Sequence, residues 1–507
     1  MSFEKEEVSH LENVEVIAAA PLAEFAHIDE KKLVRKIDMN LLPLFIVLYL
    51  LSFLDRGNIG NAKIEGLAED LNLTGNEYNM CLMVFFLCYA AMEVPSNMIL
   101  KRTPPNIYIP LTVVLFAVVM TCMGTVQNYA QLVATRALLG TFESALFPGI
   151  SYILSRYYKK NELLIRQLIF FSAASMAGAF SGLLAAAISK MDGVGGYEGW
   201  RWIFILEGLV TLIAGVVAFF TFPLFPAKAK FLTPQERLFV VHRVQFSSNA
   251  TGKASLDESS GEILEKAPLA EDDTNGRVHF WAVMKDWQCW CQMLSYMGIL
   301  LPLYAISLFT PTIIKTLGYT STKTQLMSVP IYIVAAICAV AQGFASDYVG
   351  LRSPFLVLNF TCMAVGYIVC LTGNPITNGK GVYAGIYIAA IGIYPAIPMS
   401  IVWNANNLSG TYKRAIGIAF QIGVANFSGA FVSNFYRTQD APYFRFGHGL
   451  VLMFVGIGAI FTAILIFGYM YENSRKRAAI ELGKYADLSD EELVKMGDKS
   501  PYFAYRL

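Results

Sequence analysis

Six ionisable residues stand inside otherwise apolar stretches of the sequence and could carry out chemistry there: Asp55, Arg56, Glu93, Arg136, Glu143 and Glu207. A charge at the centre of a bilayer costs about 3 kcal/mol even on a lenient insertion scale, so such residues need a reason to be there. Arginine stays charged in proteins and binds a carboxylate through two parallel hydrogen bonds. Buried Asp and Glu side chains can gain or lose a proton near neutral pH. Together, these residue types indicate an organic anion whose binding is coupled to protons.

The spacing brings four of these residues to similar depths in a membrane. If the first helix runs outward from residue 40, Asp55 lies about 22 Å along it. Arg136 lies about 9 Å below the outer end of a helix that starts near residue 130, which is nearly the same depth in a core of about 30 Å. Glu143 shares the helix face of Arg136 and sits about 10 Å deeper. With Arg56, these residues could line one cavity. The alternative is a static ion-pair network that only holds two helices together, although buried pairs add little net stability.

The elements that must position these residues are long and apolar. Of the 507 residues, 55% are hydrophobic and only 15% are charged, whereas an ordinary soluble protein is about 25% charged. A membrane-crossing helix needs about 20 mostly apolar residues, because backbone amides in lipid must bond within the helix. Twelve stretches meet this need: 40–62, 78–100, 107–126, 130–154, 164–189, 201–225, 288–313, 325–345, 354–373, 382–403, 414–436 and 448–471. The sequence therefore predicts an all-α membrane protein with twelve transmembrane helices.

Hydrophilic segments divide the chain into five parts. The predicted parts are an N-terminal tail, a six-helix bundle, a linker, a second six-helix bundle and a C-terminal tail: 1–39, 40–225, 226–283, 284–471 and 472–507. Within the linker, residues 246–276 have the composition of a flexible segment. An even number of spans puts both termini on one side, and the lysines and arginines beside the spans on that side predict that it faces the cytoplasm. A net charge of +1 gives no case for nucleic-acid binding.

The second bundle repeats the first at an offset of about 250 residues, so that Pro148 aligns with Pro398. Two parallel six-helix repeats are typical of many secondary transporters, in which the substrate site lies between the halves near the bilayer midplane. The buried charges do not follow the repeat, since Glu143 aligns with Ile393. Folding of the second half does not need these charges. Those of the first half are therefore functional candidates.

Several motifs resemble those of known transporters. Residues 343–352 fit the pattern GxxxDxxGxR, which ends at Arg352, and resemble a cytoplasmic loop signature of the major facilitator superfamily. In this loop, Asp347 could cap a neighbouring helix or pair with a basic group and so lock one conformation. Four further runs resemble the anion:cation symporter family, in its fungal allantoate-permease branch: 54–62, 93–97, 136–149 and 199–208. The resemblance implies the major facilitator fold of two six-helix bundles and proton symport of organic anions.

The same resemblance implies roles for individual residues. Arg56 would contact the substrate and Asp55 would carry a proton. Arg136 and Glu143 match the family's arginine and glutamate in the fourth helix, with Glu143 as the second proton site. Tyr89 resembles a cavity tyrosine that can hydrogen-bond a substrate, although a packed tyrosine is an equally good interpretation.

The second half should close the site with neutral polar groups. Tyr304 and Asn426 are candidate substrate contacts, and hydrogen bonding between helices is at least as good an interpretation for each. Glu93 and Glu207 are interpreted as structural. The histidines avoid the expected helix interiors, and neither a metal cluster nor a phosphate-binding glycine loop is present in the sequence. We therefore expect no enzymatic activity, cofactor or metal.

The sequence thus predicts a monomeric transporter in the plasma membrane, with both termini in the cytoplasm. Its partners would be a small carboxylate, protons and the lipid bilayer. The resemblance points to import of an anion such as nicotinate or allantoate, together with protons, by alternating access. Two alternatives stay open, a transport-inactive nutrient sensor and a facilitative anion uniporter.

Overall fold

The computed structural model describes residues 28–74, 76–249, 276–409, 411–482 and 496–507, together with Tyr485 and Leu493. These residues form helices and connecting segments, without a strand among them. Ten of the described helices are long and apolar enough to cross a membrane. Two shorter apolar segments, Met176–Met191 and Ile416–Val432, fall in the two remaining expected stretches. The prediction of an all-helical, membrane-spanning fold is confirmed.

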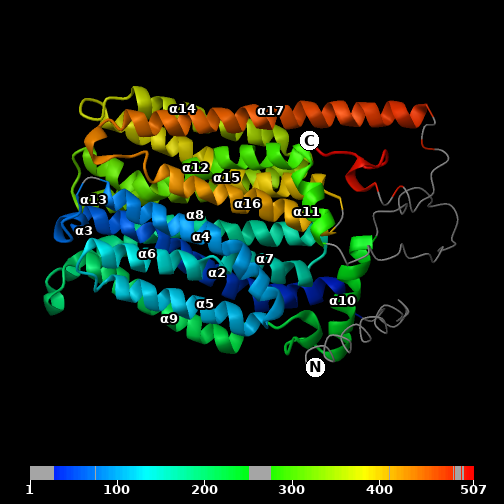
Figure 1. Ribbon diagram of the computed structural model, residues 1–507, viewed down its shortest axis with the longest axis horizontal. Coiled ribbons are helices and arrows are strands. Elements are labelled where there is room, and N and C mark those ends of the chain that lie inside the picture. Colours follow the sequence, from blue (N-terminus) through cyan, green and yellow to red (C-terminus); the bar gives the residue numbers. More distant parts are fainter. Residues whose placement is uncertain are drawn as a thin grey trace.

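The first half of the chain forms the lower layer in Figure 1. Its helices are α2 (Glu30–Ile64), α3 (Leu67–Asp70), α4 (Glu77–Arg102), α5 (Pro105–Met123), α6 (Tyr129–Glu143), α7 (Leu146–Tyr157), α8 (Lys160–Ile188), α9 (Gly199–Thr221) and α10 (Pro234–Asn249). Short 3₁₀ turns η2 (Ser189–Met191), η3 (Val194–Gly196) and η4 (Pro226–Lys228) lie in the connections.

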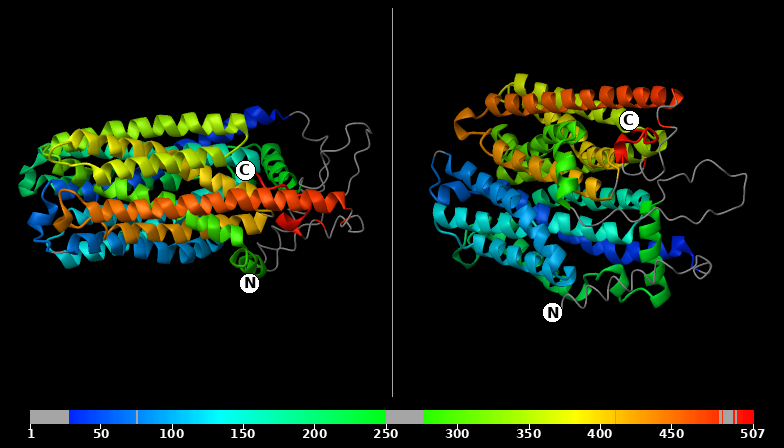
Figure 2. Two further views of the ribbon diagram at one scale, coloured as in Figure 1. Left: turned by 90° about the horizontal axis from the view of Figure 1, so that it is seen from above. Right: turned by 45° about the vertical axis from the view of Figure 1, so that its right-hand side comes forward.

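The second half forms the upper layer in Figure 1, and Figure 2 shows the same two layers from other sides. Its helices are α11 (Gly276–Met284), α12 (Trp287–Thr316), α13 (Ser321–Val349), α14 (Ser353–Thr372), α15 (Gly379–Asn407), α16 (Thr411–Val432) and α17 (Arg445–Glu481). Turns η5 (Thr438–Asp440) and η6 (Gly497–Lys499) complete it. We call the side where α2 begins and α17 ends the tail face, and the opposite side the loop face.

Some helix bounds differ from those expected. Helix α2 begins at Glu30, before the expected residue 40, because the Asp29 side chain caps it by accepting hydrogen bonds from the amides of Lys31 and Lys32. Helix α17 continues past residue 471 to Glu481. The segment expected as a linker contains α10 and α11. Most of its predicted flexible part, 246–276, lies outside the described residues.

The fourth expected span is interrupted between α6 and α7. Pro148 has no amide hydrogen to donate to the carbonyl of Ser144, four residues earlier, so the helical hydrogen bonding breaks there. The Ser144 hydroxyl also donates to the Thr141 carbonyl at 2.8 Å. Ser144 and Ala145 keep helical backbone angles, so α7 continues the path of α6. The break directly follows Glu143.

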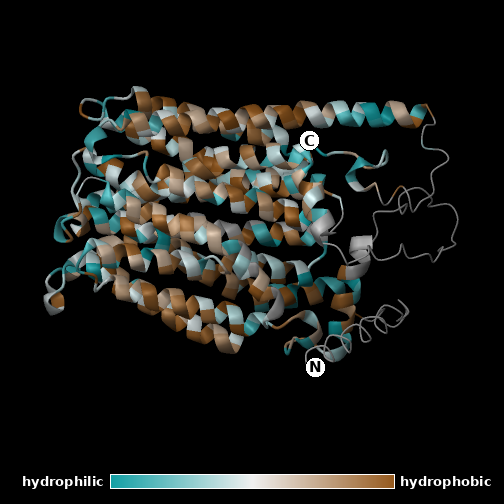
Figure 3. Ribbon diagram, viewed as in Figure 1, coloured by the Kyte–Doolittle hydropathy of each residue, from teal (hydrophilic) through white to brown (hydrophobic). Residues whose placement is uncertain are grey.

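The outer surface of both layers is apolar. Figure 3 shows hydrophobic residues along the middle of the helices and more hydrophilic residues toward their ends. Large side chains lie in the open on this surface, among them Phe220 and Phe467, which are 86% and 69% exposed. Such a surface in water would drive association. In lipid it is the expected outer surface of a membrane protein.

The halves are closed against each other at the loop face. Gly60 of α2 meets the backbone of α12 so closely that an added Cβ would lie 2.8 Å from the Leu308 carbonyl oxygen. The Lys315 ammonium donates to the Ile64 carbonyl at 2.5 Å, and the Gln325 amide donates to Glu65 at 2.8 Å. These contacts join α2 to α12 and α13 beyond the middle of the bundle.

Candidate functional site

Arg56 of α2 is buried among aromatic rings and one carboxylate. Its Nε donates to the Glu143 Oε1 at 2.5 Å, and the same oxygen accepts a hydrogen bond from the Ser52 hydroxyl at 2.5 Å. The guanidinium carbon lies 4.9 Å from the centre of the Phe53 ring and 4.7 Å from that of Tyr89. Rings that face a guanidinium stabilise its charge after water has been removed. The structure therefore brings together Arg56, Glu143 and Tyr89, as the sequence predicted.

The approach of α4 to α6 depends on a glycine. A Cβ at residue 140 would collide with the carbonyl oxygen of Phe85, so only glycine allows these two helices to lie this close. Gly140 stands one turn before Glu143 on α6. The close packing places Glu143 against Arg56 and positions Tyr89 of α4 on the other side of the guanidinium.

Asp55 and Arg136 are buried without hydrogen bonds to their charged ends. Both Asp55 carboxyl oxygens lack a partner, as do Nε and Nη2 of Arg136, and these residues are 0% and 1% exposed. The two lie close enough to interact electrostatically, and Glu143 and Glu207 also act on Asp55. A network that only held helices together would satisfy such groups, because an unpaired buried charge is costly. Both residues therefore keep polar atoms that could pair with a further group.

Glu207 is closer to this cluster than the sequence indicated. From α9, its Oε2 accepts a hydrogen bond from the Asn58 amide at 2.6 Å, while its Oε1 has no partner. Asn58 in turn lies beside Ser181, whose hydroxyl is 3.4 Å from the Asn58 Oδ1. The sequence feature that could have indicated the contact of Glu207 is Asn58, which lies one turn after Leu54 and Asp55 on α2.

The two candidate residues of the second half contact each other and the first half. The Tyr304 hydroxyl donates to the Asn426 Oδ1 at 2.9 Å, and the Asn426 amide donates to the Glu93 Oε2 at 3.1 Å. The Tyr304 ring lies 4.6 Å from the ring of Phe86. Glu93 was interpreted from the sequence as structural, and the structure pairs it with Asn426, which is 333 residues away in the chain.

A cavity lies between the halves beside Arg56. It is lined by helices α2, α8, α12, α13 and α15. Phe53 and Gly57, the near neighbours of Arg56 on α2, line it, with Tyr332 and Tyr394 on the opposite side. Its lining is aromatic and neutral, with the polar exceptions of Asn61, Ser181, Ser307 and Ser328. The lining thus combines aromatic rings with polar groups, as sites for small molecules do.

The loop motif pairs within itself. The Arg352 guanidinium forms an ion pair with Asp347 and donates to the Ser346 hydroxyl at 2.8 Å. Gly350 ends α13 with a φ of 75°, a left-handed conformation that glycine adopts without strain. The structure thus places Asp347 and Arg352 together at the tail face, far from the charged cluster of the first half.

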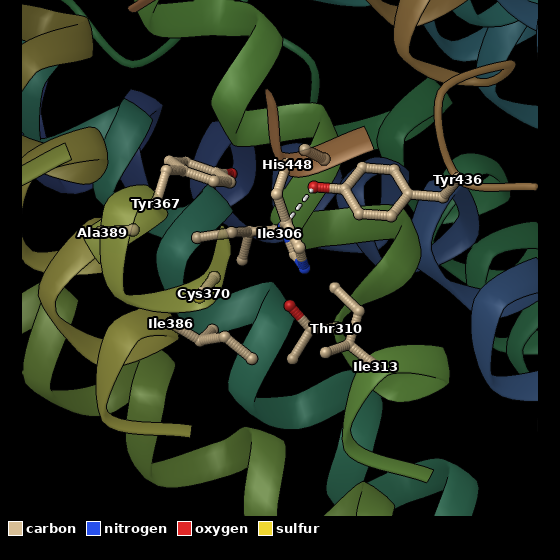
Figure 4. A pocket seen from close by; sticks show the side chains of 10 residues that line it. Ile306, Thr310, Ile313, Tyr367, Cys370, Ile386, Ala389, Tyr436 and His448 are labelled. Carbon is tan, nitrogen blue, oxygen red and sulfur yellow. Dashed lines mark hydrogen bonds between the residues drawn. The ribbon is translucent and has the colours of Figure 1, made fainter. Parts of the chain in front are cut away.

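A second hollow lies inside the second half alone and is shown in Figure 4. It holds about 250 Å³ of empty space. The Tyr436 hydroxyl and the His448 Nδ1 lie 3.2 Å apart at its edge, and the Thr310 hydroxyl points into it. His448 is buried within α17, so the expectation that the histidines avoid helix interiors is wrong for this residue. The helix begins at Arg445, three residues before the expected start, and takes His448 inside.

Comparisons with known proteins agree with this architecture. Residues 45–433 match the family model described as Major Facilitator Superfamily. The chain is 32% identical over 485 residues to an uncharacterized transporter of Schizosaccharomyces pombe, covering 94% of this chain and 91% of that protein. It is 30% identical over 486 residues to the high-affinity nicotinic acid transporter of Saccharomyces cerevisiae, covering 95% of this chain and 85% of that protein.

Solved structures share the fold at low sequence identity. A bacterial homologue of the human lysosomal transporter Spinster matches with a TM-score of 0.60 at 14% identity, covering 84% of this chain and 96% of that chain. The nucleoside transporter NupG matches with a TM-score of 0.56 at 11% identity, covering 84% of this chain and 99% of that chain. At these identities the likeness concerns the arrangement of the helices.

Proposed function

Because the chain belongs to the Major Facilitator Superfamily, we propose that it is a proton-coupled symporter of the anion:cation symporter family that imports a small organic anion. As a member of that superfamily it is a multi-pass secondary transporter and not an enzyme. The observation that carries the proposal is the unequal pairing of its buried charges. Arg56 is held by Glu143, whereas Asp55 and Arg136 are buried with unpartnered atoms.

This pairing supports an exchange of partners at Arg56. A proton on Glu143 would weaken its ion pair and free the guanidinium for a carboxylate of the substrate, which it can bind through two hydrogen bonds. The substrate's apolar ring would lie in the neighbouring aromatic cavity beside Phe53 and Tyr332. Asp55 and Arg136 would then form the second pair whose proton state changes as the halves move. Tyr89 would hold the guanidinium in place throughout.

The charge inventory of the cluster supports symport over uniport. Two arginines face four carboxyl groups, namely Asp55, Glu93, Glu143 and Glu207. Burying net charge in a medium of low dielectric constant is costly, so the empty site is neutral when it holds two protons. A bound monoanion adds one negative charge. The loaded site is then neutral with three protons, which supports the entry of one proton with each monoanion.

The best substrate candidates are nicotinate and allantoate. The relative from Saccharomyces cerevisiae is a nicotinic acid transporter, and an aromatic monocarboxylate would suit a cavity lined by Phe53, Tyr332 and Tyr394. The tail face, with exposed basic residues such as Arg156 and Arg475, would face the cytoplasm of a cell whose plasma membrane holds the protein as a monomer.

Uptake into proteoliposomes tests this proposal. Purified protein would be reconstituted, and labelled nicotinate, allantoate and pantothenate would be offered with and without an inward proton gradient. We expect accumulation of at least one anion that collapses when an uncoupler removes the gradient. Uptake that ignores the gradient would indicate the uniporter instead. Binding of an anion without any uptake would indicate the nutrient sensor.

A further inference from the structure

Glu93 forms a link between the halves close to the middle of the membrane. Its Oε2 accepts the hydrogen bond of Asn426 across the boundary between α4 and α16. Other hydrogen bonds between the halves lie near the loop face, such as the one that Lys315 donates to Ile64. The hydrogen bond from Asn426 to Glu93 lies farther toward the tail face. The carboxyl group is 6% exposed.

The surroundings of Glu93 leave room for this link. A Cβ added at Gly423 of α16 would lie 3.8 Å from the Glu93 Oε2, so the carboxyl group packs directly on the bare face of that helix. The ionisable groups that act on Glu93 from neighbouring elements are Arg56 of α2 and two tyrosines of α12, Tyr296 and Tyr304, with Tyr89 on its own helix. The Glu93 side chain therefore faces both Arg56 and the second half of the chain.

Tyr304 connects this link to the anion site. Its hydroxyl donates to Asn426, whose amide donates to Glu93. Tyr304 also lies close enough to Arg56 for the two side chains to interact. A tyrosine hydroxyl has one proton to donate. The Tyr304 hydroxyl can donate its hydrogen bond to Asn426 or to a carboxylate bound at Arg56, but not to both at once.

We propose that Glu93 is a positioning residue that couples anion binding at Arg56 to the contact between the halves. In the empty site, Tyr304 donates to Asn426, and Asn426 stays bonded to Glu93, which holds α4 against α16. A carboxylate at Arg56 accepts the hydrogen bond of the Tyr304 hydroxyl in place of Asn426, so that Asn426 is no longer held by Tyr304 and its hydrogen bond to Glu93 opens. The coupling to substrate rests on the proposed function, whereas the link itself does not.

Distances between spin labels test the inference. Labels at Arg156→Cys and Tyr348→Cys, both exposed at the tail face of opposite halves, would be placed in a background without native cysteines. In empty protein, Glu93→Ala and Asn426→Ala should each change the ratio of the two distance populations by about tenfold, the size expected for loss of one buried hydrogen bond to a charged group. Glu93→Gln keeps an acceptor oxygen for Asn426 and should behave like the unchanged protein. The matched control is Met98→Ala, a lipid-facing position on the same helix.

Addition of a mixture of nicotinate, allantoate and pantothenate tests the coupling. The unchanged protein and Glu93→Gln should shift their distances on addition, whereas Glu93→Ala should not. A shift in Glu93→Ala equal to that of the unchanged protein would overturn the inference, as would empty-state distances in Glu93→Ala and Asn426→Ala that match the control. Absence of any response in the unchanged protein, with the empty-state effects present, would count against the proposed function and leave the link intact.

Discussion

The two halves share one helical plan but differ in what they bury. The first half places Asp55, Arg56, Arg136 and Glu143 in its interior, and all of these except Arg56 have charged atoms without partners. The second half buries pairs of neutral groups, for example Asn404, whose amide donates to Gln421 at 2.8 Å. Ser295 and Thr462 pair in the same way at 2.7 Å. The buried acids outside the first half, Asp286 and Asp498, both pair with Lys413 at the tail face. This difference supports the proposal that the unpartnered charges of the first half serve transport.

The largest effect is expected from replacing Arg56, the proposed substrate-binding arginine of the first half. Arg56→Ala removes the guanidinium that would pair with the substrate carboxylate, and truncating one partner of a buried charge pair costs about 2–5 kcal/mol of binding free energy, a loss of about 30-fold or more in binding. Arg56→Lys keeps the charge but not the planar fork, and should weaken binding strongly. Equilibrium binding and uptake of labelled nicotinate would measure both.

The control for this comparison is Arg156→Ala, which removes an exposed arginine that donates to the Tyr152 hydroxyl at the tail face. It should leave uptake within about twofold, since such surface substitutions change little. Normal uptake by Arg56→Ala would show that Arg56 does not bind the substrate, and would contradict the proposed functional difference between the halves.

The next effect separates proton coupling from binding. Glu143→Gln keeps an oxygen that can accept from Arg56 and Ser52, but it cannot carry a proton. We expect accumulation driven by a pH gradient to fall by about tenfold or more, while exchange of internal for external anion continues. Glu69→Gln, an exposed acid near the loop face, is the control. Accumulation at the unchanged level would show that Glu143 is not a proton site.

The sequence predicted the helices of the two halves and the positions of the buried charges better than it predicted the contacts between helices. The twelve apolar stretches and the position of Asp55, Arg56, Arg136 and Glu143 follow from length, spacing and helix periodicity. The ion pair of Asp347 with Arg352 also follows from a local pattern. These features depend on residues near each other in the chain or on one helix.

Contacts between distant segments could not be predicted in the same way. The contacts of Glu93 and Glu207, which were interpreted as structural, involve Asn426 and Asn58 on other helices. A lone carboxyl in an apolar run does not reveal which amide faces it, since that depends on how the helices pack. His448 was misplaced for a related reason, because the start of α17 at Arg445 is set by its packing in the second half.

A smaller effect is expected in the neutral half. Gln421→Ala removes the acceptor for the Asn404 amide and the donor to the Ser400 hydroxyl, so buried polar groups lose their partners. This should lower stability by about 1–3 kcal/mol, seen as an earlier thermal transition in detergent. The dependence of uptake on the proton gradient should stay as it was. A change in that dependence as large as that of Glu143→Gln would show that the neutral half takes part in proton coupling.

The smallest change in stability is expected at Asp55, a residue of the first half whose carboxyl oxygens have no hydrogen-bond partner. Asp55→Asn has nearly the same shape, and neither Asp55 oxygen accepts a hydrogen bond that could be lost. Stability should therefore change by no more than about 1 kcal/mol, although proton-driven accumulation should fall. If Asp55 instead belonged to a static ion-pair network with Arg136, its loss would strand the arginine and cost about 3–5 kcal/mol. Thermal unfolding and gradient-driven uptake of the same preparation distinguish the two, because a proton site loses transport and keeps stability, whereas a structural pair loses stability first.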